Sequence, residues 1–354
     1  MPAPSQAMIS LLASPHALIH DEAHLRKLIK GGKLKGIDEG SVEATVAKVQ
    51  GVGAERREAI QQYVDKLARE FPDPRFERLG FNLVATKIPN ALAIHVREDD
   101  SYAIGLDPTI HEMLTWLLVT AHWAYQRKEP EIFLQLAVNF VRLGFLNMDL
   151  PPENEDSMTL FVRAIRPEHE QMGSWTLAIA AAFLVGHEMG HIYLGHFHNG
   201  KPFKMQFVPA KAEKDAVAGF SAAHEHEADE WAAKAVLQIS KTGIWENVLA
   251  RTLPSILFSI IAVIDDLYWP TTPLATHIRQ SHPPASLRAE KLQQIGAIDK
   301  EIPFPDELAA LFALSDWITS KRLEPKFQEF AQKHREHYAR LGLSAGVASN
   351  SQSG

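Results

Sequence analysis

Four histidines lie within twelve residues of the segment FLVGHEMGHIYLGHFHNG, which covers residues 183–200. The first two, His187 and His191, flank Glu188 in the pattern HExxH. Helical residues four apart lie on one face, so both imidazoles can reach one metal ion. Zinc suits imidazole ligands, and in catalytic sites it keeps a position for water, whose proton a neighbouring carboxylate can accept. The spacing therefore predicts a zinc site with His187 and His191 as ligands and Glu188 as catalytic base.

A third ligand is expected from the segment HEHEAD at residues 224–229. Glu225 and Asp229 are four apart and share a helix face. One carboxylate can complete the site, while the other accepts the second ring N–H of a ligating histidine. Glu227 would lie about 200° around the helix from Glu225, so both cannot face the metal. The pairing with Asp229 favours Glu225 as the ligand.

The remaining histidines of the first segment do not fit a third-ligand position. A site of the metzincin type needs glycine at position 194 and histidine at position 197, which here are Leu194 and Phe197. His196 and His198 lie beyond the expected end of the helix, and we expect them in loop or capping roles.

The segment SHPP at residues 281–284 is followed by Arg288. Its prolines suit the start of a helix. A His-Pro pair alone usually marks an ordinary loop. Beside a zinc site, His282 becomes a candidate donor that stabilises the oxyanion of the transition state, and Tyr193 is the alternative donor.

Composition limits the other possibilities. The 354 residues contain no cysteine, which excludes thiolate zinc sites, disulfides and cysteine nucleophiles. The net charge is −7 and no basic block is present, which argues against nucleic acid or an anionic membrane surface as a partner. The N-terminus does not have the pattern of a secretory signal. The uncharged runs 113–126, 172–187 and 252–264 are shorter than the roughly 20 residues that cross a bilayer, so we expect buried helices, no membrane span and a cytoplasmic location.

Hydrophobic periodicity predicts a mainly helical chain with a few strands. Strand character is found at 81–86, 91–96 and 101–106, and the last two stretches are expected to form a hairpin. We expect residues 195–220 to form an irregular loop. Helices are expected over 41–71 with a break at Gly51–Gly53, over 109–127, over 174–194 with Gly195 as the C-cap, over 221–239, from 285, and over 305–342.

The chain resembles the gluzincin metallopeptidases of the CAAX prenyl endopeptidase and HtpX type. The resemblance lies in three motifs in this order: HEMGH, EHEAD, and SHPP followed by an arginine. The resemblance implies zinc bound by His187, His191 and Glu225, with Glu188 as base. It places Asp229 in the second shell of the metal, and His282 and Arg288 near the substrate. PNALAI (89–94) and YAIGLDPTIHEML (102–114) are similar to the family's strands, and an edge strand there could align an extended peptide.

The fold class implied is mainly α with a small antiparallel β-sheet (α+β), built on a zincin-like metalloprotease core. About seventy residues separate the strands from HExxH, where the family has only a short helix, so a helical insertion is expected. The expected organisation is a helical N-terminal region (1–80), a peptidase domain (81–300) with an insertion (120–173), a C-terminal helical region (301–343) and a disordered tail (344–354).

The leading functional hypothesis is a zinc endopeptidase, a hydrolase acting on protein or peptide substrates. One alternative is an aminopeptidase or small amide hydrolase, which would need an anchor for the substrate amine. The other is a non-enzymatic or latent interaction or sensor protein with a structural or occluded zinc site, including a role of the phage-exclusion type.

Overall fold

The computed structural model describes residues 42–84, 91–96, 99–140, 176, 178–199, 201–202, 218–240, 243–268, 283–296 and 306–340. This part of the chain is mostly helical with a small three-stranded sheet, which confirms the expected α+β class. The chain divides into two compact units. The first comprises Met1–Ile110 and Leu184–Gly219, and the second comprises His111–Phe183 and Phe220–Gly354.

The first unit is built around a mixed sheet of β1 (Leu79–Leu83), β2 (Ala91–Val96) and β3 (Ser101–Leu106) in the order β1-β3-β2. The expected hairpin of β2 and β3 is confirmed, because the two strands pair antiparallel. The expectation of an antiparallel sheet is wrong for β1, which pairs parallel with β3. The chain reverses direction twice between β1 and β3, so these strands run the same way, and β3 lies between the other two.

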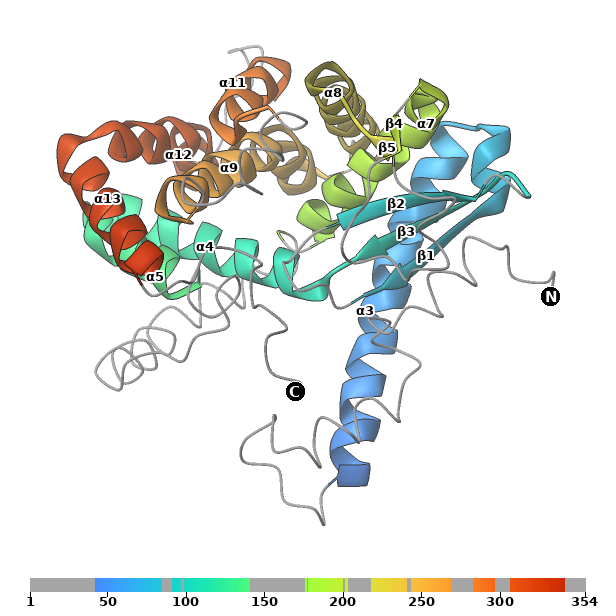
Figure 1. Ribbon diagram of the computed structural model, residues 1–354, viewed down its shortest axis with the longest axis horizontal. Helices are drawn as coiled ribbons and strands as arrows, with labels where there is room; N and C mark the ends of the chain where they lie inside the picture. The colour runs from blue at the N-terminus through green and yellow to red at the C-terminus, as the bar shows by residue number, and fades with distance from the viewer. Residues whose placement is uncertain are drawn as a thin grey trace, which may run out of the picture. The chain divides into compact units, whose positions relative to one another are not determined.

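The sheet core is apolar, and α3 (Val42–Glu70) packs against β1 (Figure 1). Every residue of β3 is buried, as expected for a central strand covered on both faces. The expected break at Gly51 and Gly53 is wrong, because α3 continues through both positions. A glycine inside a helix costs about 1 kcal/mol relative to alanine, which lowers helix stability without ending the helix.

The first unit also contains the 3-10 helix η2 (Pro74–Arg78), the short helix α7 (His196–Asn199), and the strands β4 (Lys201–Pro202) and β5 (Ala218–Gly219). β4 and β5 pair antiparallel. The expectation of an entirely irregular loop over 195–220 is therefore wrong at its two ends, and residues 203–217 lie outside the described part of the chain.

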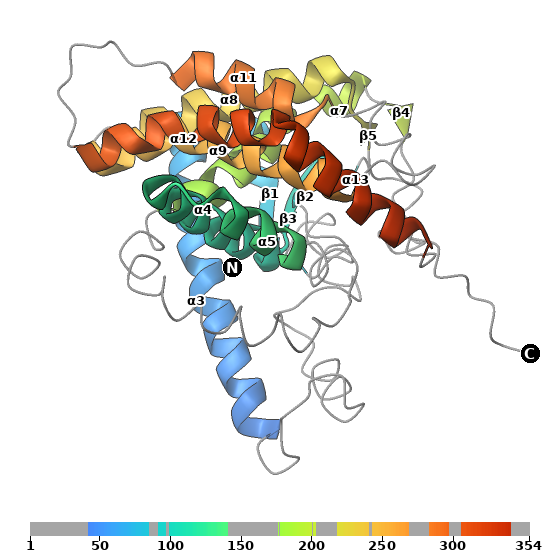
Figure 2. The same ribbon diagram turned by 90° about the vertical axis from the view of Figure 1, so that its left-hand side faces the viewer.

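The second unit is helical, and α9 (Ile244–Tyr268) is its central element (Figure 2). Among the described residues, five labelled helices pack against α9. They are α5 (Pro130–Phe140), α8 (Ala222–Ile239), α11 (Ala285–Gly296), α12 (Asp306–Leu323) and α13 (Pro325–Arg340). α4 (Pro108–Arg127) precedes α5. The helices expected at 109–127, at 221–239, from 285 and over 305–342 are thus confirmed, with a break at Glu324.

The apolar run 252–264 lies within α9. By length and composition alone, the stretch Glu246–Leu267 could cross a membrane, but 83% of its most apolar 18 residues are buried inside the structure. This is the pattern of a core helix. The run is therefore a buried helix, as expected. Most of the expected insertion (141–173) and the expected tail (344–354) lie outside the described residues, as do residues 1–41.

Gly296 marks a close approach between the backbones of α11 and α9. A Cβ atom at position 296 would lie 2.1 Å from the carbonyl oxygen of Arg251. We predict that Gly296→Ala destabilises the protein by about 1–3 kcal/mol, because the two helix backbones must move apart. Urea unfolding measures this free energy.

Gly243→Ala is the matched control. Its Cβ would meet only the flexible side chain of Glu246, whose nearest atom is at 3.3 Å. This variant is expected to unfold within about 0.5 kcal/mol of wild type. Equal stabilities of the two variants would contradict the close packing of α11 on α9.

Candidate metal centre

The HExxH segment lies on a helix formed by residues 178–193. Nearly all of this helix is buried, including Glu188, which is 7% exposed, and His191, which is 1% exposed. Apolar residues such as Val185, Met189 and Ile192 surround the polar ones in sequence and are fully buried. Buried polar and charged groups are costly unless they are hydrogen-bonded, paired or bound to a metal.

The rings of His187 and His191 face each other one helical turn apart. Their Nε2 atoms are 3.1 Å apart, and the ring planes are nearly perpendicular at 88°. Zinc–nitrogen bonds of about 2.0–2.1 Å in tetrahedral geometry place two ligand nitrogens about 3.3 Å apart. His187 as a whole is partly buried, but its ring Nδ1 is fully enclosed. The pair therefore has the separation of two ligands of one ion.

The C-terminal end of this helix is held by Arg75. Its guanidinium donates hydrogen bonds to the carbonyl oxygens of Ile192, at 2.6 Å, and Tyr193, at 2.8 Å. Asp73 orients that guanidinium through two further hydrogen bonds of 2.8 and 2.6 Å. The hydrogen bond from Arg75 lowers the pKa of the Asp73 carboxyl, so the pair is charged at neutral pH. Arg75 thus binds two of the last helical carbonyls, and that of Ile192 also accepts a hydrogen bond of 3.0 Å from the backbone N–H of Gly195.

His196 was expected in a loop or capping role, but it begins the short helix α7 and its ring is buried beside His191. Its Nδ1 is 2.9 Å from Nδ1 of His191, and the residue is only 3% exposed. Gly195, at φ 72°, ends the helix in the left-handed conformation that was expected of a C-cap. The side chain of His198 lies outside the described residues.

The carboxylates of the second segment lie on α8 in the second unit. Ser221 caps the start of α8, and its hydroxyl accepts a hydrogen bond from the backbone N–H of His224. Glu225 and Asp229 are each 2% exposed, whereas Glu227 is exposed. Glu225 lies in the first turn of α8, where the helix dipole stabilises a negative charge.

Arg288 of α11 joins the two buried carboxylates of α8. It binds Asp229 through two hydrogen bonds of 2.6 Å, and its third nitrogen is 3.3 Å from Oε2 of Glu225. The guanidinium also lies over the ring of Phe258, 4.0 Å from its centroid. One buried cation thus faces two buried carboxylates. His282 lies outside the described residues.

His187, His191 and Glu225 each offer one ligand atom, and these atoms lie within 4.8 Å of one another. The three groups are therefore close enough to bind a metal ion. Two imidazoles and a carboxylate form a ligand set found in catalytic zinc sites, in which water takes the fourth position. Glu227, the competing carboxylate, belongs instead to a second group, in which its ligand atom and those of His196 and His224 also lie within 4.8 Å of one another, but Glu227 itself is exposed.

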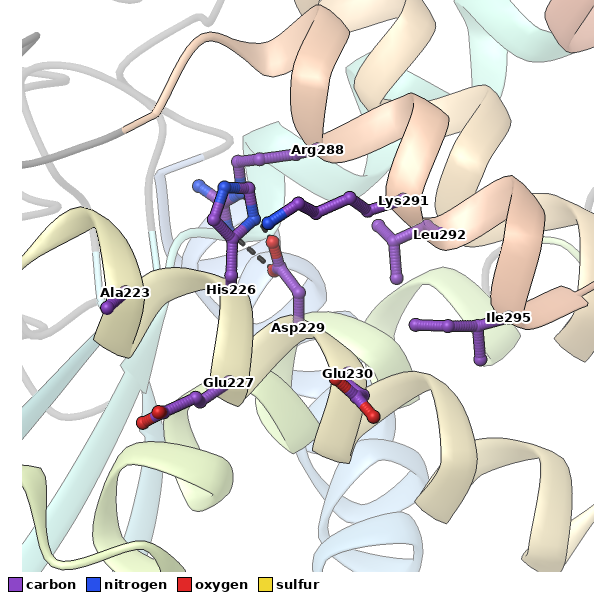
Figure 3. A pocket seen from close by; sticks show the side chains of 9 residues that line it. All are labelled: Ala223, His226, Glu227, Asp229, Glu230, Arg288, Lys291, Leu292 and Ile295. Carbon is purple, nitrogen blue, oxygen red and sulfur yellow. Dashed lines mark hydrogen bonds and ion pairs between the residues drawn. The ribbon is translucent and has the colours of Figure 1, made fainter.

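A groove of about 280 Å³ lies between α8 and α11 (Figure 3). In Figure 3 the Lys291 side chain extends toward the ring of His226, above the ion pair of Asp229 and Arg288. Burial, followed by the positive charge of Lys291, lowers the pKa of His226. Nine residues line the groove, and Glu225 is not one of them. The groove therefore does not contain the proposed third metal ligand.

Comparisons with known proteins add no relative. We find no match to the models of known protein families, and no similarity to a curated protein or to a solved structure.

We predict that Arg288→Ala destabilises the protein by about 3–5 kcal/mol, because it leaves two buried carboxylates without their cation. Lys326→Ala is the control. Lys326 pairs with Glu131 at 3.0 Å, and both side chains are exposed, at 82% and 65%. That variant should lose no more than about 1 kcal/mol. Urea unfolding of both variants measures the difference, and an equal loss would contradict the central place of Arg288.

Proposed function

We propose that His187, His191 and Glu225 bind one zinc ion and that the protein is a zinc-dependent endopeptidase of the gluzincin type. The observation that carries this proposal is the proximity of the three ligand atoms, all within 4.8 Å of one another. Their donor chemistry also fits zinc, because two imidazoles and one carboxylate are ligands of catalytic zinc sites.

In the proposed mechanism, a zinc ion bound there would polarise the scissile carbonyl and lower the pKa of water to about 7. Glu188 follows His187 directly in the chain and is buried on the same helix. Its carboxylate accepts the proton of the attacking water and delivers it to the nitrogen of the leaving amine. Arg288 keeps Glu225 and Asp229 in place by the ion pairs described above.

Protein or peptide is the proposed substrate class. The strand order β1-β3-β2 makes β1 and β2 the outer strands of the sheet in the first unit. An outer strand can bind an extended peptide through backbone hydrogen bonds, which a small amide substrate cannot use. We further propose that the enzyme acts in the cytoplasm, because its charge balance and buried helices favour neither nucleic acid nor a membrane as partner.

The metal ligands are tested by metal analysis of the purified protein. We expect about one equivalent of zinc in wild type and in Glu227→Ala, and a much lower content in Glu225→Ala. Of these two glutamates, Glu225 is buried and lies close to His187 and His191, whereas Glu227 is exposed. Atomic absorption or mass spectrometry measures the content after dialysis. Zinc lost from the Glu227 variant alone would reassign the third ligand.

The role of Glu188 is tested separately from metal binding. We predict that Glu188→Gln keeps its zinc but loses about 10²–10⁴-fold in the rate of peptide cleavage, because the amide cannot accept the proton of water. Cleavage of a denatured protein is compared with cleavage of single-residue amides to separate endopeptidase from aminopeptidase activity. A variant that cleaves as fast as wild type would refute the assignment of the base.

A further inference from the structure

We propose that His196 is a positioning residue for His191, which it holds in the orientation and tautomer that direct Nε2 to the metal. This inference rests on the proposed metal site, since it assigns to His191 the role of ligand. His196 itself would not touch the metal or the substrate.

The hydrogen bond between the rings of His191 and His196 restricts the tautomers that the two residues can adopt. Nδ1 of His191 and Nδ1 of His196 are 2.9 Å apart, so one of them carries the hydrogen. Nε2 of His191 faces Nε2 of His187 at 3.1 Å, on the other side of the ring. A histidine that binds metal through Nε2 carries its hydrogen on Nδ1 and donates it to a neighbouring acceptor. His196 is that acceptor, and its own hydrogen then lies on Nε2.

The backbone explains how His196 reaches this position. In a continuous helix, a residue five positions after His191 would lie about 140° away from it around the axis. The left-handed conformation of Gly195 ends the helix and changes the direction of the chain before α7 begins. The side chain of His196 then returns to the ring of His191, with the ring centroids 5.1 Å apart.

The next residue, Phe197, holds this turn against the hairpin of β2 and β3. Its ring makes edge contacts with His95 and with Tyr102, each at 5.8 Å between centroids. Those two rings are stacked on each other at 4.5 Å, and His95 is hydrogen-bonded to Asp100 at 2.8 Å. Phe197 is 5% exposed, so the turn has a buried anchor directly beside His196. A position fixed on both sides in this way suits a residue that orients a ligand.

Two substitutions separate positioning from packing. His196→Asn places an amide oxygen near the position of Nδ1 and keeps the acceptor, whereas His196→Leu fills similar space without one. We expect zinc affinity, measured by competition with a chelator, to fall about 10–100-fold in His196→Leu and to stay within a few-fold of wild type in His196→Asn. Wild-type affinity in the leucine variant, or an equal loss in both variants, would overturn the proposal.

A measurement on the metal-free wild-type protein keeps the inference testable if a variant fails to fold. Nitrogen-15 NMR of the imidazoles is expected to find the shared hydrogen on Nδ1 of His191, with a nitrogen–nitrogen coupling to Nδ1 of His196 across the hydrogen bond. A hydrogen located on Nδ1 of His196 would overturn the proposal. Failure of the proposed function is distinguishable, because a wild-type protein without zinc affinity leaves this NMR result unchanged.

Discussion

The candidate site depends on the energetic cost of burying polar groups. The helix of residues 178–193 is enclosed on nearly every side, yet it carries His187, Glu188 and His191. Such groups are retained in an apolar environment only with hydrogen bonds, ion pairs or a metal. The two imidazoles meet this requirement together, because one helical turn brings their Nε2 atoms to 3.1 Å. The hydrogen bond from Arg75 to the carbonyl of Ile192 and the contact of His196 with His191 fix the end of the same helix.

The same constraint explains the charges on α8. Glu225 and Asp229 are buried one turn apart, where two carboxylates alone would repel each other. Arg288 neutralises one of the two negative charges and uses its planar fork to bind both oxygens of Asp229. Glu225 retains the weaker contact of 3.3 Å, so it is the carboxylate better placed to bind a second cation. The position of Arg288 therefore explains why Asp229 makes the ion pair with two hydrogen bonds and Glu225 makes only the longer contact.

Features encoded locally could be predicted from the sequence. The helical period, the start of a helix near Ser221 and the stop at Gly195 depend on neighbouring residues, and the structure contains all three. The failures concern contacts between distant segments and small energy balances. The parallel pairing of β1 depends on the position of β3, which lies farther along the chain. The helix α3 continues through Gly51, because the low helix propensity of glycine lowers the stability of a helix without ending it. The contact of His196 with His191 depends on the backbone turn at Gly195. The regular spacing of residues along a helix does not predict such a turn.

X-ray absorption at the zinc edge of the metal-loaded protein tests the central claim most directly. The account predicts one zinc per chain, with two imidazole nitrogens at about 2.0–2.1 Å and the remaining first-shell ligands all oxygen. The outer-shell scattering of two imidazole rings should be visible, and each of the variants His187→Ala and His191→Ala should lose the contribution of one ring. A shell made only of oxygen, or one that contains both rings after these substitutions, would contradict the assignment of the site.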